Sequence, residues 1–268
     1  MRIVMREGWL QNKSIVIIGG TTGIGLSAAQ AFIREGANVV AIGRNPASAE
    51  KAAALLKTAV VTTGDATHKG VAQDAIDECL RHFGSFDGLY HVAGGSGRRH
   101  GDGPLHALTR EGWEYTLSLN LTGLMLSNQA AVKTFMERKQ GGSILNMGSV
   151  LGYSPSPLHF ATHAYAAAKA AAIGFTQSTA AYYASANIRI NLIAPALVET
   201  PMAQRAANDD TILSFIRTKQ PLDGGRIGHP ADLDGAAVYF MSDYSRFTTG
   251  QVLAVDGGWD VSEGQYHD

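Results

Sequence analysis

Residues 14–25, with the sequence SIVIIGGTTGIG, decide the fold of this chain. The run 14–18 is apolar and rich in β-branched residues, which predicts a strand buried on both faces of a parallel sheet. Glycines follow at positions 19, 23 and 25, and the amphipathic segment 26–35, which ends before Gly36, predicts a helix directly after the turn. A buried strand that passes through a glycine turn into a helix is typical of the first unit of an α/β sheet.

The same alternation continues along the chain on both sides of the glycine turn. Apolar segments predict strands at 38–42, 59–63, 86–93, 143–147, 188–194 and 252–255, and amphipathic segments predict helices at 47–57, 69–82, 109–139, 161–179, 200–219 and 230–242. Within 109–139 we expect a short helix and then a long one, with Gly112 and Gly123 as weak points. This order predicts an α/β fold with one Rossmann-like, doubly wound parallel sheet of about seven strands and helices on both faces. Because no linker or repeat interrupts it, residues 1–268 are expected to form a single domain.

The composition suits a large buried core and argues against several classes of protein. The chain has 268 residues, 45% of them hydrophobic, and a net charge of -1, without the basic excess of a nucleic-acid-binding protein. Cys79 is the only cysteine, so no intrachain disulfide can form, which agrees with a reducing compartment. Arg2 and Arg6 precede only the short apolar run 15–18, which is too short for a signal peptide or a membrane span. We therefore expect a cytoplasmic protein with a small-molecule ligand and neither nucleic acid nor membrane as a partner.

The glycine turn after the first strand predicts a dinucleotide site. Glycines let the backbone approach a pyrophosphate, and free N–H groups and the dipole at the helix N-terminus favour its negative charge. The residues expected to bind this part of the cofactor are Gly19, Thr21, Thr22, Gly23, Ile24 and Gly25. A turn with a purely structural role is the alternative.

The residue after the second strand indicates which dinucleotide is preferred. An acidic residue there would accept hydrogen bonds from the ribose 2′-hydroxyl of NAD(H), but the sequence has Gly43 followed by Arg44. A guanidinium that contacts a 2′-phosphate contributes roughly 1.5–3 kcal/mol, a preference of at least tenfold. We therefore expect NADP(H), with NAD(H) as the alternative if Arg44 only lies on the surface.

Tyr165 and Lys169 form a candidate acid/base pair. They lie in the alanine-rich segment 161–179, where a helix would place residues four apart on one face. A cation within about 4–6 Å of a tyrosine favours the phenolate and is expected to lower the pKa by ~1–3 units. Taken alone, this spacing is also typical of an ordinary surface pair on a helix.

The ordered set of motifs resembles the classical short-chain dehydrogenase/reductase family from about residue 13 to residue 259. The matching positions are the glycine turn, Asp65, Ala93, Gly94, Asn120, Ser149, Tyr165, Lys169, Pro195, Thr200 and the run 256–258. The resemblance implies that an Asn120-Ser149-Tyr165-Lys169 tetrad transfers protons while a nicotinamide passes hydride between a ketone and a secondary alcohol. It also implies cofactor contacts at Ala93, Gly94, Tyr165, Lys169, Pro195, Val198 and Thr200, and at Asp65 with the adenine. Asp65 is equally well explained as a turn residue, and Thr200 as the start of a helix.

Three departures from the family pattern affect details of the site. The family's usual Asn-Asn-Ala-Gly is His91-Val92-Ala93-Gly94 here, so a hydrogen bond made by the second asparagine must be absent or replaced. Ala196 follows Pro195 in place of glycine, which limits backbone freedom next to the nicotinamide. The segment between Ser149 and Tyr165 is longer than is common and is expected to reshape the substrate pocket, together with a substrate-loop region at about 196–228.

Other features leave alternatives open. Arg98, Arg99 and His100 in the long glycine-rich loop 96–108 are a candidate site for an anionic group on the substrate, or simply solvated charges. His159 and His163 lack a third metal ligand, so we expect no metal. The resemblance implies a homodimer or homotetramer built on the segments 124–136 and 166–175. Two rival functions are an NAD-linked secondary alcohol dehydrogenase and a non-catalytic module that senses a dinucleotide.

Overall fold

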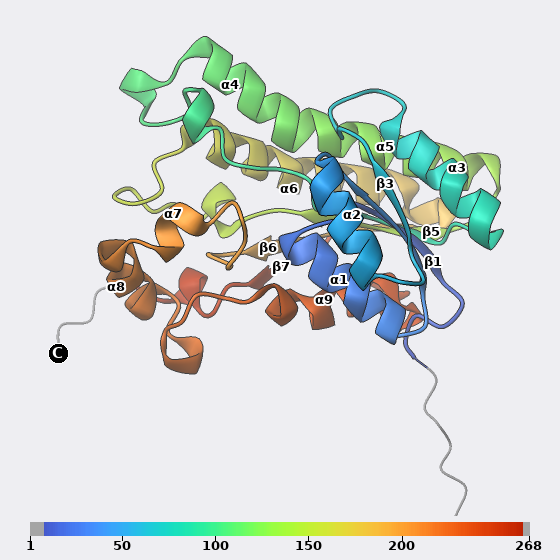
Figure 1. Ribbon diagram of the computed structural model, residues 1–268. Coiled ribbons are helices and arrows are strands. Elements are labelled where there is room, and N and C mark those ends of the chain that lie inside the picture. Colours follow the sequence, from blue (N-terminus) through green and yellow to red (C-terminus); the bar gives the residue numbers. More distant parts are fainter. Residues whose placement is uncertain (1–7, 265–268) are drawn as a thin grey trace, which may run out of the picture.

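The structure is a computed structural model that describes residues 8–264 (Figure 1). Arg2, Arg6 and the other residues of 1–7 and 265–268 lie outside the described residues. Seven parallel strands form one sheet in the order β3-β2-β1-β4-β5-β6-β7, which confirms the predicted fold. The strands are β1 (Ser14–Ile18), β2 (Asn38–Gly43), β3 (Val60–Thr63), β4 (Gly88–His91), β5 (Gly142–Met147), β6 (Ile188–Pro195) and β7 (Val252–Val255).

Helices cover both faces of the sheet, as the continuous apolar strands require. Ile15 and Ile17 of β1 join a buried cluster with one set of helices, whereas Val16 and Ile18 join a separate cluster on the opposite face. Because successive side chains of a strand point to opposite faces, both positions of the alternation must be apolar. Full burial of each such side chain contributes roughly 1.5–3 kcal/mol.

The helices lie in two layers and one cap (Figure 1). One face is covered by α1 (Gly23–Arg34), α2 (Pro46–Leu55) and α9 (Asp234–Met241), and the other by α3 (Val71–Phe83), α5 (Gly123–Glu137) and α6 (His163–Tyr183). Three further helices extend to the left in Figure 1, beyond the end of the sheet where β1 meets α1: α4 (Arg110–Leu117), α7 (Gln204–Ala207) and α8 (Asp210–Lys219).

Two predicted helical segments differ from the structure. The single helix expected at 200–219 is wrong: α7 ends at Ala207, and α8 begins anew because the Asp209 carboxylate accepts hydrogen bonds from the backbone N–H groups of Thr211 and Ile212. In 109–139 the short and long helices do occur, but a π-helical turn at Ser118–Thr122 joins them without a break. The glycine at position 123 follows this turn rather than ending a helix.

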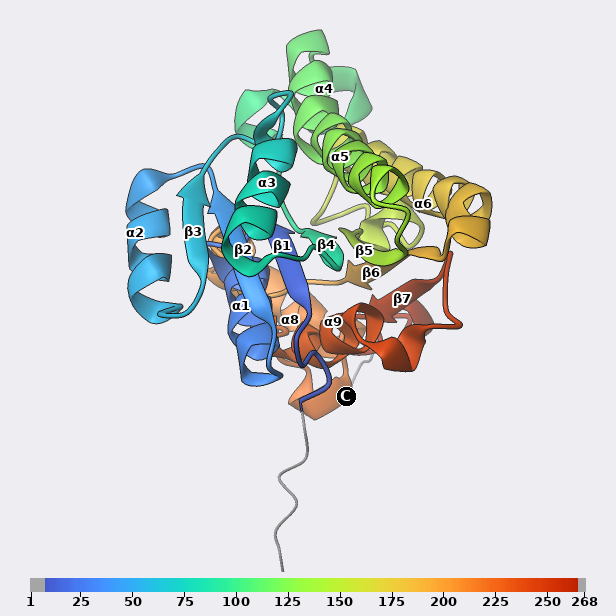
Figure 2. The same ribbon diagram turned by 90° about the vertical axis from the view of Figure 1, so that its right-hand side faces the viewer.

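The order of the strands places a crevice between β1 and β4. From β1 the chain proceeds outward to β2 and β3 and then returns to the opposite side of β1, where β4 pairs with it (Figure 2). In doubly wound sheets ligands bind at such a switch point, outside the carboxyl ends of the strands. The glycine turn follows β1, and Ala93 and Gly94 follow β4, so both predicted motifs lie at this crevice.

The described residues contain neither a membrane-spanning helix nor a metal cluster. No helix within 8–264 is long and apolar enough to cross a bilayer. In the same range no group of three or more His, Cys, Asp and Glu side chains is arranged to hold a metal ion.

Candidate active site

A cavity of about 880 Å³ opens at the switch point. This volume is near the upper end of the roughly 300–1,000 Å³ typical of ligand sites. Most of the predicted site residues line the cavity: Gly19, Thr21, Thr22, Gly23, Ile24, Arg44, Asp65, Ala93, Gly94, Ser149, Tyr165, Lys169, Pro195, Val198 and Thr200. Gly25 and Asn120 do not line the cavity and lie behind the residues that form its wall.

The glycine turn is shaped for close approach of another group. Gly19 has a φ of +91°, and a Cβ there would lie 2.6 Å from the backbone nitrogen of Ala93. A Cβ on Gly25 would lie 2.1 Å from the Gly19 carbonyl oxygen, so this position packs the helix onto the strand. In the described part of the chain, Thr22 at the N-cap of α1 makes no side-chain capping hydrogen bond, and the first turn has no acidic residue. The N-terminus of α1 is therefore available to an anion such as a pyrophosphate.

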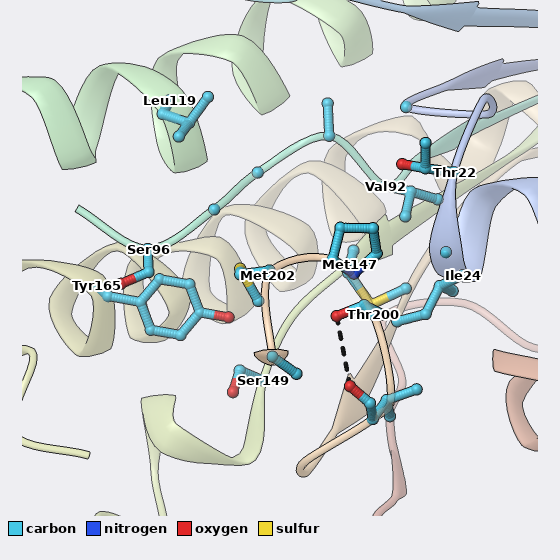
Figure 3. Close-up of a pocket in the computed structure, with 18 of the residues that line it drawn as sticks. Thr22, Ile24, Val92, Ser96, Leu119, Met147, Ser149, Tyr165, Thr200 and Met202 are labelled. Atoms are coloured by element: carbon cyan, nitrogen blue, oxygen red, sulfur yellow. Dashed lines mark hydrogen bonds between the residues drawn. The ribbon is translucent and has the colours of Figure 1, made fainter. Parts of the chain in front are cut away.

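The tyrosine, lysine and serine of the predicted tetrad meet at one end of the cavity. In Figure 3, Tyr165 and Ser149 lie at this end, and Thr22 and Ile24 of the glycine turn lie at the other. The Lys169 Nζ is 5.5 Å from the centroid of the Tyr165 ring and donates a 2.8 Å hydrogen bond to the Met147 carbonyl oxygen. Tyr165 and Lys169 come from the same face of α6, whereas Ser149 follows β5. The helix thus brings the pair together as their spacing predicts.

Burial shifts the pKa values of Tyr165 and Lys169 so that both groups favour their neutral forms. For the tyrosine this shift is opposite to the expected one. Burial raises the pKa of Tyr165 to about 12, although a hydrogen bond with the Ser149 side chain acts the other way. Burial also lowers the pKa of Lys169 to about 8. The tyrosine pKa is therefore not lowered as expected, because burial disfavours the phenolate and outweighs the Ser149 hydrogen bond. Tyr165 is a protonated acid at neutral pH.

Asn120 anchors the helical bulge to the loop after β4. It lies in the π-helical turn, fully buried, and its Nδ2 donates hydrogen bonds to the carbonyl oxygens of Thr116 (2.9 Å) and Gly95 (2.8 Å). Its Oδ1 accepts a 3.0 Å hydrogen bond from the Gly95 N–H. Gly94 fits between the asparagine and the lysine, since a Cβ there would lie 2.7 Å from Asn120 Oδ1 and 3.5 Å from Lys169 Nζ. π-Helical turns of this kind often occur at functional sites.

Asp102 supports the start of α6, the helix that carries Tyr165 and Lys169, from a loop far away in the sequence. Its carboxylate is 5% exposed and accepts hydrogen bonds of 3.0 Å from the backbone N–H groups of Ala164 and Tyr165, in the first turn of α6. A carboxylate in this position satisfies two helix-terminal donors and complements the helix dipole. Sequence reasoning did not identify Asp102; its only signal was its place in the long loop 96–108.

The far end of the cavity contains Arg44 and Asp65. The Arg44 Nη1 is 3.8 Å from Asp65 Oδ2, and the other oxygen of Asp65 accepts hydrogen bonds from the Thr67 backbone N–H (2.9 Å) and hydroxyl (2.7 Å). Burial alone would raise the pKa of Asp65, but the hydrogen bonds from Thr67 and the Arg44 charge hold it below its usual value. Asp65 thus has the predicted turn role and still lines the cavity. A Cβ on Gly43 would lie 1.8 Å from the Thr21 hydroxyl, so no acidic side chain fits there without rearrangement.

Thr200 extends from the segment after β6 across the glycine turn. A Cβ on Gly23 would lie 3.1 Å from its methyl group, and its hydroxyl donates a 3.3 Å hydrogen bond to the Val198 carbonyl oxygen (Figure 3). Pro195 is the last residue of β6. Val198 forms an isolated β-bridge to Gly228, which holds the two ends of the 196–228 region together. Ala196 has no positive φ, so its backbone conformation is one that alanine adopts without strain.

The departures at positions 91 and 92 have different structural consequences. His91 is fully buried, and its Nδ1 lies 3.0 Å from the Ser127 hydroxyl. Burial, with the nearby Lys169 charge, lowers the pKa of His91 to about 3, so the imidazole is neutral. Val92, where the family has its second asparagine, turns an apolar side chain toward the cavity (Figure 3).

The longer segment before Tyr165 forms part of the cavity wall. Phe160 packs edge-on against Trp259 at 5.8 Å between ring centroids, and Trp259 donates a 3.2 Å hydrogen bond from Nε1 to the Ser154 carbonyl oxygen. Phe160 and Trp259 both line the cavity. Of the three basic residues in the loop 96–108, Arg98 and Arg99 also line it, but His100 instead stacks on Tyr115 at 3.7 Å.

A glycine turn at a sheet switch point, joined by one cavity to a buried tyrosine and lysine, defines the class of nicotinamide-dependent oxidoreductases. The family model described as enoyl-(acyl carrier protein) reductase matches residues 19–260. The chain belongs to the short-chain dehydrogenase/reductase family, whose members use NAD(P)(H), and is an oxidoreductase acting between CH–OH and C=O groups.

Three similar proteins illustrate this relationship. The 2-(S)-hydroxypropyl-CoM dehydrogenase 3 of Xanthobacter autotrophicus is 36% identical over 262 residues, covering 93% of this chain and 97% of the relative. The 3-oxoacyl-(acyl-carrier-protein) reductase of Chlamydia trachomatis is 33% identical over 257 residues, covering 94% and 99%. A solved short-chain type dehydrogenase/reductase from Mycobacterium ulcerans has a TM-score of 0.86 and 28% identity, covering 94% of this chain and 91% of that one.

Proposed function

We propose that this protein is an NADP(H)-dependent oxidoreductase that interconverts a ketone and a secondary alcohol, with Tyr165 as the acid/base. One observation supports this most directly. The tyrosine and Ser149 line the same cavity as the glycine turn, and the Lys169 Nζ lies 5.5 Å from the tyrosine ring centroid. One small molecule and one dinucleotide can therefore meet at the hydroxyl groups.

The residues present fit a dinucleotide. The backbone at Gly19 and Gly25 has no space for a Cβ, and the uncapped N-terminus of α1 offers N–H groups to a pyrophosphate. Further contacts would come from Thr21, Thr22, Ile24, Asp65, Ala93, Gly94, Pro195, Val198 and Thr200. The nicotinamide supplies hydride chemistry when it is bound.

Each side chain of the tetrad has a role that follows from its environment. The Ser149 hydroxyl holds the substrate oxygen, on which negative charge develops during reduction. Tyr165, whose pKa of about 12 keeps it protonated, donates its proton to that oxygen, and charged Lys169 stabilises the resulting phenolate. Asn120 holds the bulged helix against Gly95 and so fixes the wall behind the lysine. Tyr165 thus starts in the protonated form that reduction requires, and the reverse reaction uses the same groups.

The preference for NADP(H) depends on Arg44. Its side chain is 63% exposed and lines the cavity, and its one acidic neighbour in the described structure, Asp65, is at the long distance of 3.8 Å. An exposed, weakly paired guanidinium is free to contact a 2′-phosphate.

An NAD-linked alcohol dehydrogenase is the second candidate. The name of the Xanthobacter relative, a dehydrogenase of a secondary alcohol, favours it. A non-catalytic dinucleotide-sensing module is a weaker candidate, because all four tetrad residues are present and Tyr165 and Ser149 line the cavity.

Spectrophotometric assays of NADPH and NADH with cyclic, aromatic, sugar-like and acyl-thioester ketones test the proposal in both directions. We expect reduction of at least one ketone and a loss in kcat of roughly 10²–10⁴-fold for Tyr165→Phe, with unchanged cofactor affinity. Cofactor binding without turnover of any ketone or alcohol would support the sensing module instead.

The cofactor preference is measured on the same preparations with Arg44→Ala. The affinity ratio of NADPH to NADH should fall at least about tenfold. Arg34→Ala removes a charge from the end of α1 outside the cavity and serves as the control. An unchanged ratio in Arg44→Ala, or equal affinity for both cofactors in the parent, would favour the NAD-linked alternative.

A further inference from the structure

Two arginines from distant segments meet at the rim of the cavity. Arg98 lies in the loop after β4, and Arg205 lies in α7. Their Nη2 atoms both donate hydrogen bonds to the same acceptor, the His159 carbonyl oxygen, at 3.2 Å and 3.1 Å respectively. Both side chains line the cavity.

This arrangement leaves two positive charges without a negative partner. Within residues 8–264, neither guanidinium is in an ion pair with a carboxylate. Asp102 is the carboxylate whose charge raises the pKa of Arg98. Both Asp102 oxygens, however, accept hydrogen bonds from the first turn of α6. The shared carbonyl oxygen carries only a partial negative charge, so it offsets only part of the repulsion between the two guanidinium groups. Burial and the charge of Arg205 both lower the pKa of Arg98.

We propose that Arg98 and Arg205 form a subsite for an oxyanion group, a carboxylate or a sulfonate, at the end of the substrate remote from its reacting carbonyl. This inference rests on the proposed ketone or alcohol oxidoreductase activity and adds the class of substrate. Two guanidinium groups suit the two or three oxygens of such a group, because each can donate a charge-assisted hydrogen bond.

The position of the pair favours the substrate over the cofactor. Arg98, His159 and Arg205 belong to the three segments that lie outside the nucleotide-binding motifs: the loop 96–108, the longer segment before Tyr165, and the 196–228 region. In Figure 1, α7 lies on the left of the molecule, whereas α2, which follows Arg44, lies to its right. The phosphates of the dinucleotide already have a site at the N-terminus of α1. An oxyanion bound by the pair would also link α7 to the loop after β4, and so close the cavity over the substrate.

A series of oxo acids and their methyl esters tests the subsite. The acids are acetoacetate, 4-oxopentanoate and 5-oxohexanoate, with 4-oxopentane-1-sulfonate as a second oxyanion. For the parent we expect a kcat/KM at least about tenfold higher for the best acid than for its ester. In Arg98→Gln and in Arg205→Gln this ratio should fall by about tenfold or more, while kcat/KM for the ester changes less than about twofold. Higher salt should reduce the preference in the parent.

Arg217→Gln is the matched control, because it removes the same charge from the exposed surface of α8, outside the cavity. Its acid-to-ester ratio should equal that of the parent. If kcat/KM fell equally for the acid and the ester in the Arg98 and Arg205 variants, the proposed subsite would be wrong, and the two arginines would have only a structural role. Turnover of neutral ketones with no preference for acids would also overturn it, without affecting the proposed function.

Calorimetric binding keeps the two proposals separate. Pentanoate and pentanamide are titrated into the parent and the two variants with NADP⁺ present. If no ketone is reduced, the proposed function fails, but binding of pentanoate over pentanamide that is lost in Arg98→Gln and Arg205→Gln still supports the oxyanion subsite. Equal binding of acid and amide would overturn it.

Discussion

Among single residues, Lys169 carries the largest electrostatic cost in the site. Its side chain is 3% exposed, and the hydrogen bond to the Met147 carbonyl oxygen does not replace the water that a charged ammonium loses. The pKa of about 8 expresses this cost, since the ordinary value is 10.5. A residue that destabilises the fold is expected where function requires a charge, as the proposed stabilisation of a phenolate would.

Replacing Lys169 should therefore stabilise the cofactor-free protein while abolishing turnover. Below pH 8 the lysine is charged in both the folded and the unfolded state, so the full cost of burying its charge is present. Between pH 8 and 10.5 the folded protein binds fewer protons than the unfolded chain, and the cost fades as pH rises. We expect Lys169→Met to raise the free energy of unfolding by roughly 1–3 kcal/mol at pH 7, with an advantage that shrinks toward pH 10.

Denaturant unfolding at several pH values measures this difference. Lys133→Met is the control, because Lys133 lies on the surface of α5, 67% exposed and in a 3.7 Å pair with Glu137. Lys133→Met should change the free energy of unfolding only slightly, and by nearly the same amount at every pH between 7 and 10. A Lys169→Met protein less stable than the parent at pH 7 would show that the lost hydrogen bond outweighs the relief of desolvation.

Spacing alone predicted the site residues whose chemistry is local, whereas Asn120 and Ser149 were predicted from the resemblance to the family. Tyr165 and Lys169 are related by one helix turn, and the glycines at 19, 23 and 25 by one strand-to-helix turn, so spacing alone brings each set together. Asp102 and Arg205 were not predicted, because their partners, the first turn of α6 and His159, are far away in the chain. The pKa of the tyrosine was misjudged for a related reason: burial depends on the tertiary structure, whereas the spacing of a cation does not.

At the level of elements, a single carboxylate connects the loop 96–108 to the N-terminus of α6. Asp102 holds the N–H of Tyr165 itself, so a change in this contact moves the backbone that carries the tyrosine. In Asp102→Asn, one oxygen is replaced by an amide NH₂ that cannot accept a hydrogen bond. A displacement of about 1 Å at a reacting group can reduce the rate by ~10²-fold.

We expect Asp102→Asn to lower kcat about tenfold or more, and to lower the free energy of unfolding by roughly 1–3 kcal/mol, with little change in cofactor affinity. Steady-state kinetics and denaturant unfolding give the two quantities. Asp209→Asn is the control for loss of a carboxylate charge at a helix N-terminus, because Asp209 accepts two backbone hydrogen bonds on a single oxygen at the start of α8, which carries no tetrad residue. Equal effects of both variants on kcat would contradict a positioning role for Asp102.

Helix and strand boundaries were predictable where apolar patterning decides them. The observed β7 spans the predicted residues, and β1 ends where the glycines begin. The division of 200–219 into α7 and α8 was missed because its cause is a side-chain cap by Asp209 in a polar segment. The π-helical turn before Gly123 has no periodic signal, since it is held by Asn120 and its contacts with the loop after β4.

For the whole molecule, α6 presents an outer surface made mostly of small, uncharged residues. It lies beside α5 over one face of the sheet (Figure 2), and Leu124 of α5 and Ala172 of α6 belong to one buried cluster. On α6 the exposed positions include Ala170, Ala171 and Gly174, and a Cβ on Gly174 would meet no atom within 4 Å. Small side chains allow close approach of a second helix, so this face suits a copy of the same chain across a two-fold axis. The expected dimer or tetramer built on 124–136 and 166–175 remains a proposal.

Sedimentation velocity at micromolar concentration tests this assembly. We expect the parent to sediment as a dimer or tetramer, and Ala171→Glu to shift it toward a smaller species, because an unpaired charge desolvated in an interface costs several kcal/mol. Ala54→Glu makes the same substitution at an exposed position on α2 and should leave the assembly intact. A parent that sediments as a monomer, or an Ala171→Glu protein that assembles like the parent, would place any interface elsewhere. The inner face of α6 carries Tyr165 and Lys169, so a dimer on its outer face would also restrain the backbone of these two residues. If they are catalytic as proposed, Ala171→Glu should lower kcat together with the sedimentation coefficient.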